Sequence, residues 1–149
     1  MSVMGVAKFE RFFRAAASLD VDKEDLRRHN DFVGQKVYDL LLLGQAGARF
    51  NLRDVIEVWD LPLTKGLQES MNQFERLDEE IELQPILDAV AARGPLDLAL
   101  GFDTEARLPI IAGGISVALA RTLTVLDPRS KNPSSQHWQR AFEVFDLLL

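Results

Sequence analysis

Apolar residues recur along this chain at the spacing of amphipathic helices, and the same order of helices occurs twice. In each copy, the spacing of the apolar residues predicts a short helix, a long helix and a second short helix. A unit of this kind cannot bury its own long helix, so two units must pack against each other within one polypeptide. The apolar stripes of the six expected helices span residues 6–16, 26–48, 63–74, 83–90, 111–126 and 138–148.

Acidic residues mark the expected starts of three helices. Asp22, with Asp25 three residues later, is expected to cap the long helix of the first copy. Asp60 is expected to cap the third helix, with Pro62 in its first turn, where proline is tolerated. Asp103 takes the same place before the long helix of the second copy. Between the second and third helices, Val55-Ile56 is expected as a short extended piece.

The two copies define the predicted domain organisation. We expect a single compact all-α domain over residues 1–149, with a first unit over 1–80 and a second over 81–149. A chain of this length buries roughly two-thirds of the surface that it exposes when unfolded. Gly113-Gly114 lies inside an apolar helix and lacks the flanking residues of a phosphate-binding loop, so it predicts close packing of helices.

Composition argues against several kinds of chemistry. The chain has no cysteine, which excludes disulfides, thiolate nucleophiles and cysteine-bound zinc. Its two histidines, His29 and His137, fall in different copies and have no metal-ligand spacing. We therefore expect no catalytic residues, no metal and no cofactor, and hence a protein that is not an enzyme.

The apolar segments are short. The longest uninterrupted one, residues 108–120, has 13 residues, whereas roughly 18 or more are needed to span a bilayer. Near the N-terminus, Lys8, Glu10 and Arg11 interrupt any continuous apolar core of a signal peptide. The expectation is a soluble cytoplasmic protein with no membrane partner and no small-molecule substrate.

Charge opposes general attraction to nucleic acid. The formal net charge is −6, and residues 1–80 carry 11 basic against 15 acidic side chains, while residues 81–149 carry 6 against 8. Long-range electrostatics therefore repel a phosphate backbone. The most acidic run, residues 75–82, is expected to be a solvated linker, with a docking surface for a basic partner as the alternative.

The stretch from Arg53 to Asp60 matches a known pattern. In histone folds an arginine in the loop after the long helix pairs with an aspartate seven residues later, and Arg53 and Asp60 have this spacing. The whole chain resembles a family of small bacterial proteins of uncharacterised function with two tandem histone folds in one chain. That resemblance implies an intramolecular pseudodimer with a structural clamp between Arg53 and Asp60. It is carried by residues 9–14, 19–23, 60–69, 131–133 and 144–149.

The resemblance also implies where DNA would bind. Paired histone folds place the first loop of one unit beside the second loop of the other, which would form two basic clusters able to hold phosphate. The alternative is that these residues are solvated charges on a balanced surface. The first cluster would contain Lys23, Arg27, Arg28, Arg129 and Lys131, and the second Arg49, Arg53 and Arg93.

Two departures from the histone pattern support a different function. Histones that bind DNA usually carry a threonine two residues after the clamp arginine, where this chain has Val55, and Arg129 is followed seven residues later by Gln136. The leading prediction is a non-enzymatic bacterial histone-like protein that contacts double-stranded DNA weakly and without sequence preference, at the nucleoid. The alternative is a histone-fold module for protein–protein interaction or self-assembly that does not bind DNA.

The C-terminal residues 145–149 contain more leucine than one helix face needs. Core packing is one interpretation, and self-association through the second and third helices, as in histone tetramers, is the other. From the second we predict a homodimer of pseudodimers. Light scattering at high micromolar concentration should give twice the 16.8 kDa of one chain, and a monomer mass under those conditions would exclude the dimer.

Overall fold

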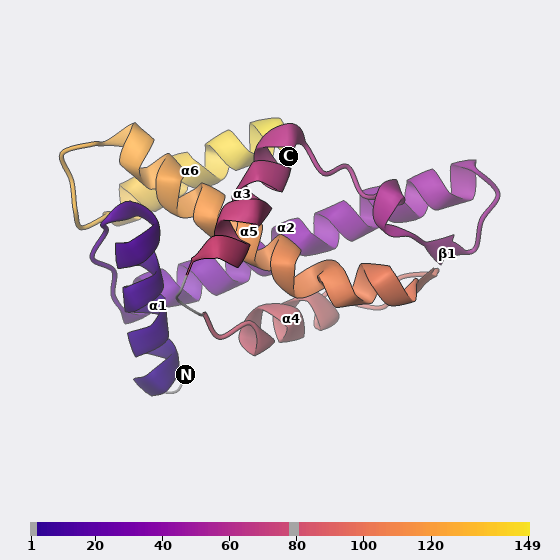
Figure 1. Cartoon of the computed structure of the whole chain (residues 1–149), viewed down its shortest axis with the longest axis horizontal. Helices are drawn as coiled ribbons and strands as arrows, with labels where there is room; N and C mark the ends of the chain where they lie inside the picture. The colour runs from indigo at the N-terminus through magenta and orange to yellow at the C-terminus, as the bar shows by residue number, and fades with distance from the viewer. Residues whose placement is uncertain (1–2, 78–80) are drawn as a thin grey trace.

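The computed structural model describes residues 3–77 and 81–149, and it is mainly α-helical (Figure 1). In the described residues the chain forms six α-helices, two strands of two residues each and one short 3₁₀-helix. In chain order these are α1 (Val3–Ala17), α2 (Lys23–Phe50), β1 (Val55–Ile56), η1 (Val58–Asp60), α3 (Lys65–Arg76), α4 (Gln84–Ala91), β2 (Ala99–Leu100), α5 (Phe102–Leu126) and α6 (Ser135–Leu148). The expected acidic linker includes residues 78–80, which lie outside the described residues.

The predicted all-α class and the order of short, long and short helices are observed. The start of α2 is also as predicted, because Asp22 and Asp25 form a reciprocal capping box. The backbone N–H of Asp25 donates to the carboxylate of Asp22 at 2.9 Å, and the N–H of Asp22 donates to Asp25 at 3.1 Å. Two of the otherwise unsatisfied donors at the helix start are thereby bonded.

Two predicted helix starts are wrong. Asp60 ends η1, and α3 begins at Lys65 with Thr64 as its cap. The reason is Pro62, which disfavours the helical conformation at the preceding residue, so the chain stays extended at Leu61. The second wrong start is that of α5, where Gly101 and not Asp103 is the capping residue. Asp103 lies in the first turn of α5, where the positive end of the helix dipole stabilises its carboxylate.

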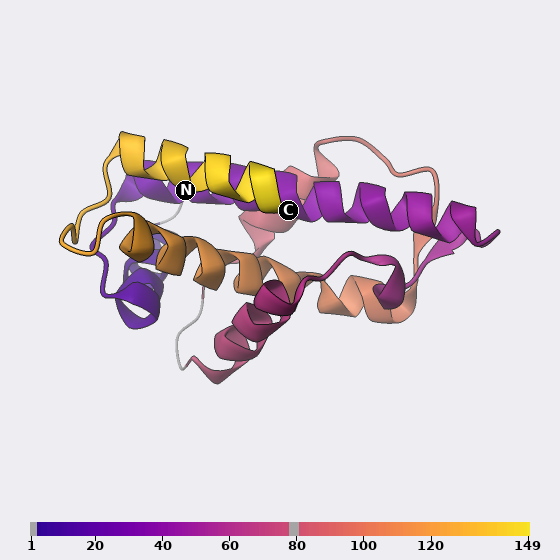
Figure 2. The same cartoon turned by 90° about the horizontal axis from the view of Figure 1, so that it is seen from above.

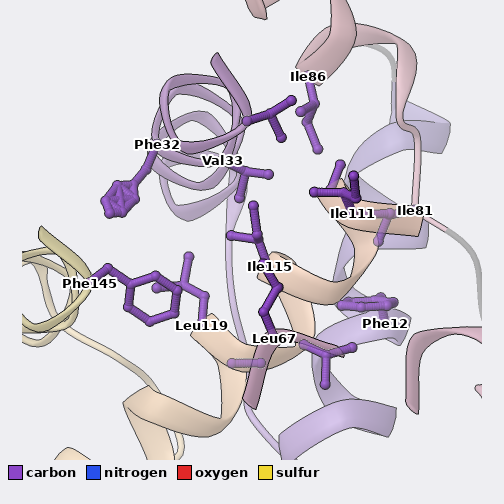
Figure 3. Packing of buried hydrophobic residues seen from close by; sticks show 14 of the residues in the cluster. Phe12, Phe32, Val33, Leu67, Ile81, Ile86, Ile111, Ile115, Leu119 and Phe145 are labelled. Carbon is purple, nitrogen blue, oxygen red and sulfur yellow. The ribbon is translucent and has the colours of Figure 1, made fainter. Parts of the chain in front are cut away.

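The centre of the molecule is α5, which the first half of the chain covers. Figure 3 shows Ile111, Ile115 and Leu119 of α5 surrounded by side chains from the other helices. Among the helices described, α5 is long and apolar enough to cross a membrane, with a mean hydropathy of 1.6, but 61% of that segment is buried inside the protein. Its apolar character is therefore accounted for by its position as the core helix.

The helix α6 lies along α2 in both views (Figures 1 and 2). The Phe142 ring of α6 stacks on Phe32 of α2, with ring centroids 4.1 Å apart. The buried Lys36 of α2 pairs with Asp146 of α6. The long helix of the first half is thus covered by the last helix of the second half, as α5 is covered by the first half.

One histidine joins the two long helices inside the core. Nε2 of His29 on α2 lies 2.8 Å from the hydroxyl of Ser116 on α5, and Nδ1 lies 3.1 Å from the side-chain oxygen of Asn30. Complete burial lowers the pKa of His29 to about 4, so the ring is neutral at pH 7. This histidine is a packing residue and is closed off from any ligand.

Gly113 and Gly114 allow α3 and α5 to approach closely, as the sequence predicts. A Cβ at Gly113 would lie 2.4 Å from ring atoms of Phe74. A Cβ at Gly114 would lie 2.4 Å from Cγ of Met71 and 3.0 Å from its backbone N and Cα. Because backbone atoms cannot move aside as a flexible side chain can, Gly114 fixes the spacing of the two helices.

We expect Gly114→Ala to lower the free energy of unfolding by about 1–3 kcal/mol, the usual cost of overpacking a core. The matched control is Gly66→Ala in α3, where an added Cβ would meet no atom within 4 Å. That substitution should be neutral or stabilising by up to about 1 kcal/mol, since alanine is the better helix former. Urea denaturation measures both, and equal stability of the two variants would contradict the packing role of Gly114.

Candidate nucleic-acid interface at the paired loops

Loops from the two halves meet at both ends of α2 (Figure 1). Loop pair A consists of residues 18–22 and 127–134, and the backbone N–H of Asp20 donates to the carbonyl of Lys131 at 2.7 Å. Loop pair B consists of residues 51–57 and 92–101, where β1 and β2 run parallel. These backbone bonds fix which loops are neighbours, and so bring together residues far apart in the sequence.

Loop pair B is also closed by bonds to a single carbonyl. The oxygen of Ile56 accepts from the backbone N–H of Gly101 at 2.9 Å and from the buried hydroxyl of Thr104 at 2.8 Å. Ile56 itself is fully buried. The start of α5 is therefore held against β1, and the end of the molecule that contains Arg53 is rigidly framed.

Four basic side chains are exposed at loop pair A and in the adjoining first turns of α2: Lys23, Arg27, Arg129 and Lys131. No side-chain hydrogen bond or ion pair of these four is found among the described residues. Arg28, the fifth cation predicted here, differs because its guanidinium bonds the carboxylate of Asp25 at 3.2 Å. Four of the five predicted residues are thus free to meet an anion.

The acidic residues of loop pair A are largely occupied. Oδ1 of Asp20 lies 3.4 Å from Nη2 of Arg14, and Oδ2 of Asp127 lies 3.2 Å from Nε2 of His137. Asp25 is buried, and this burial raises its pKa, while the backbone N–H of Asp22 and the Arg28 guanidinium bind its carboxylate. Asp22 caps α2, and Glu24 is exposed beside Lys23, so the charge at this end is close to balanced, whereas the whole chain carries −6.

At loop pair B, Arg53 and Asp60 form a bidentate ion pair. Nη1 of Arg53 donates to Oδ2 of Asp60 at 2.7 Å, and Nη2 donates to Oδ1. The same carboxylate accepts the backbone N–H of Glu57 at 2.8 Å. The Arg53 hydrogen bonds, followed by that backbone bond, hold the pKa of Asp60 below its ordinary value despite partial desolvation. The pair ties the loop after α2 to η1.

The other basic residues predicted at loop pair B are not available as a cluster. Arg49 pairs with Asp97 at 2.7 Å. Arg93 donates to the backbone carbonyl of Asp31, and Asp31 and Arg49 are separated by about 27 Å along α2 at 1.5 Å per residue. The expected grouping is wrong for Arg93 because the chain runs from the end of α4, beside the middle of α2, to β2 at the far end.

Four exposed apolar residues near loop pair B were missed from the sequence. They are Phe50, Leu52, Trp59 and Phe102. Phe50 is the last residue of α2, and Leu52 follows two residues later. Helical periodicity gives no signal that either side chain stays exposed.

The fold and the loops define a class: an all-α protein in which two halves of three helices interlock and in which loops of opposite halves meet at each end. In the described part of the chain, no group of three or more His, Asp or Glu residues could hold a metal ion. The chain belongs to the family described as a domain of unknown function, DUF1931, which it matches over residues 9–146.

Two relatives come from Aquifex aeolicus (strain VF5), and both are named only as uncharacterized proteins. One is 26% identical over 142 residues, which cover 95% of this chain and 82% of the relative. The other is 31% identical over 90 residues, which cover 59% of this chain and 54% of the relative. Neither name states an activity or a ligand.

Two crystal structures are similar to this chain. A protein from Thermus thermophilus is 53% identical and superposes with a TM-score of 0.90 over 97% of both chains. A protein from Aquifex aeolicus, solved at 1.9 Å, is 22% identical and superposes with a TM-score of 0.85 over 100% of both chains. The second shows that the fold is retained at low sequence identity.

The pair between Arg53 and Asp60 gives a pH-dependent contribution to stability. The folded pKa of Asp60 is lowered from 3.8, so the contribution is complete above the unfolded value and is lost as the pH falls through the folded value. We expect Asp60→Asn to lower the free energy of unfolding at pH 7 by about 1–3 kcal/mol. The difference from the wild type should shrink below about pH 4.

Urea denaturation at about pH 7, 5 and 2.5 measures this effect, because the lowest value lies well below the unfolded pKa of an aspartate. The matched control is Asp54→Asn, which changes an exposed carboxylate of the same loop and should alter stability by less than about 0.5 kcal/mol. A deficit of Asp60→Asn that stays constant down to about pH 2.5, well below the unfolded pKa, would show that its cause is not the ionised carboxylate.

Proposed function

We propose that this chain contains two tandem histone folds packed as an intramolecular pseudodimer, and that it contacts double-stranded DNA without sequence preference through loop pair A. Three observations support the fold assignment. Each half has a short, a long and a short helix. Loops of opposite halves meet through the parallel pairing of β1 and β2. Arg53 and Asp60 form an ion pair at the spacing of the histone clamp.

The observation that carries the DNA proposal is the group of exposed cations at loop pair A. The bond from Asp20 to Lys131 brings the start of α2, with Lys23 and Arg27, to the loop that holds Arg129 and Lys131. Arginine and lysine side chains supply most protein contacts to phosphate. Such contacts do not distinguish base sequences, which is why we propose binding without sequence preference.

The start of α6 adds to the attraction for phosphate. Its cap is Ser134, whose hydroxyl accepts the N–H of His137 at 3.3 Å, and the Ser134 N–H donates to Nδ1 of His137. These caps are not carboxylates, although the Asp127 carboxylate, 3.2 Å from Nε2 of His137, offsets part of the positive end of the helix dipole. Helix starts without carboxylate caps favour bound anions.

The net charge of −6 limits the strength of this contact. Charges separated by more than about 8 Å are largely screened at physiological salt, so a local cluster can attract DNA although the whole chain is acidic. Only a few phosphates can be reached from one loop pair, and we therefore propose weak, salt-sensitive binding without wrapping.

The test is fluorescence anisotropy of a short DNA duplex at several salt concentrations. The logarithm of the affinity should fall linearly with the logarithm of salt concentration, with a slope corresponding to about two to four released counterions. Lys23→Ala combined with Lys131→Ala should weaken binding and lower that slope by about two. Arg49→Ala combined with Arg93→Ala removes two cations elsewhere and is the matched control.

Each outcome decides between the two functions considered. Loss of binding in the first pair of substitutions but not in the control supports loop pair A as the DNA contact. No binding by the wild type at about 50 mM salt, where phosphate contacts are strong, would reject DNA binding and favour a histone-fold module for protein partners. Equal losses in both double variants would reject loop pair A as the site.

A further inference from the structure

The end of the molecule opposite loop pair A exposes four large apolar side chains. Leu52 is 95% exposed, Phe50 88%, Phe102 87% and Trp59 73%. Single exposed apolar residues are common on protein surfaces, but a group of them at one site marks an interaction surface. We refer to these four residues as the apolar tip.

Contacts of loop pair B hold the members of the apolar tip near one another. Leu52 precedes Arg53, whose guanidinium lies 5.9 Å from the centre of the Trp59 ring. Phe102 follows Gly101, which is bonded to Ile56 and packs so closely on Glu57 that an added Cβ would lie 2.7 Å from its carboxylate. The tip is therefore part of the rigid frame around β1 and β2.

The backbone at Leu52 has a left-handed conformation, with φ of 57°. Leucine adopts this region rarely, because its Cβ crowds the backbone there. The Arg53 N–H donates to the carbonyl of Ala48 at 2.9 Å and the Leu52 N–H to that of Arg49 at 2.9 Å, which fix this turn. The chain thus presents a fully exposed leucine on a turn that glycine would occupy more easily.

The charges around the apolar tip are mostly negative. Arg49 and Arg53 are both paired with carboxylates. Asp54, Asp103 and Glu105 are exposed, and no ion pair of theirs occurs within residues 3–77 and 81–149. Arg107 is the remaining cation of the first turns of α5. An acidic rim of this kind repels phosphate groups of DNA or of lipids and attracts a cationic partner.

A hollow lies beside Trp59. Its volume is about 370 Å³, its apolar walls include Val58, Leu61 and Met71, and its polar lining includes one carboxylate, Glu75, and one cation, Arg107. A hollow of this size next to an exposed tryptophan can accept an apolar side chain of a partner, and tryptophan is enriched among residues that dominate binding energy.

We propose that the apolar tip docks a polypeptide segment of another protein that is rich in both apolar and basic residues. Apolar side chains of that segment cover the tip, and its lysine or arginine side chains face Asp54, Asp103 and Glu105. A second copy of this chain fits less well, because a twofold contact would bring two acidic rims together. This surface is distinct from loop pair A, so the proposal stands or falls independently of DNA binding.

The two tryptophans provide an internal probe. Trp59 is exposed, whereas Trp138 is completely buried. The probe ligand is a synthetic amphipathic peptide of leucine and lysine, and its matched control has glutamate in place of every lysine. In ¹⁵N-correlated NMR spectra, the lysine peptide should shift the indole resonance of Trp59 and the amides near residues 50–54 and 101–104 saturably. The Trp138 indole should not move, and the glutamate peptide should shift nothing.

Substitutions then locate the surface. Phe50→Ser combined with Leu52→Ser should weaken binding of the lysine peptide at least tenfold, and Asp54→Asn combined with Asp103→Asn should weaken it several-fold. Val125→Ser combined with Leu147→Ser is the matched control, because these residues are similarly exposed elsewhere, at 77% and 84%. All of these side chains are exposed, so the variants should keep the fold. Only the variant with Asp103→Asn should lose a little thermal stability, because it removes a carboxylate from the first turn of α5.

Four results with the peptides or the protein alone would overturn the proposal, and a fifth result, with DNA, would do so as well. The four are equal peptide affinity of the tip variant and the wild type, equal binding of the glutamate peptide, shifts that centre away from the tip, and movement of the tip resonances with protein concentration alone. The last would identify a second copy as the occupant. Movement of the tip resonances on addition of duplex DNA, with none on addition of the lysine peptide, would assign the tip to nucleic acid instead.

Discussion

The structure depends on the burial of one helix, α5, by residues of the other half of the chain. Its buried face meets α1, α2 and α3 from the first half, and its spacing from α3 is set where Gly114 meets the backbone of Met71. A helix this apolar would be costly to expose, since each buried CH₂ group contributes about 0.8 kcal/mol. Neither half can therefore leave the other without exposing its long helix, and the interlocked arrangement is a condition of folding.

The positions of the loops follow from the interlocked arrangement, because it brings Asp20 to Lys131 at one end and Val55 to Ala99 at the other.

Fixed loops make local charge more informative than net charge. The chain carries a formal charge of −6, yet its carboxylates are distributed unequally between the two ends. At loop pair A, Asp20, Asp25 and Asp127 each have a basic neighbour, and four cations remain exposed. At loop pair B the arginines are bound to Asp60 and Asp97, and exposed carboxylates remain. Because screening limits these interactions to about a Debye length, the charge that a partner would meet at either end is set by the local balance of that end.

The sequence predicts the helices well and the side-chain environment of the loops only in part. Periodicity finds all six helices because burial of one helix face requires it. The capping box of Asp22 can be predicted because its two residues are only three positions apart in the sequence. The predicted starts of α3 and α5 are wrong. The extended conformation before Pro62 displaces the start of α3, and the contact of Gly101 with Glu57 places Gly101 at the start of α5 instead of an acidic cap. Arg93 is misplaced because loop length alone does not reveal that α4 packs beside Asp31. The exposure of Phe50 and Leu52 could not be derived, because periodicity reports which residues can be buried and does not show which apolar residues remain outside.

Joining the two halves in one polypeptide allows the two ends to differ. In a symmetric dimer of identical chains each residue occurs twice, so a charge or an apolar residue placed at one loop pair also appears at the other. Here each residue occurs once, and the ends differ accordingly: the ion pair of Arg53 with Asp60 stands at loop pair B, while Arg129 at the corresponding place of loop pair A remains exposed. Under the two proposals made above, the cationic end and the acidic, apolar end would bind partners of unlike charge. Since about 40 Å of α2, at 1.5 Å per residue, separates them, two partners could bind at once without contact, and the protein would then hold them at a fixed distance.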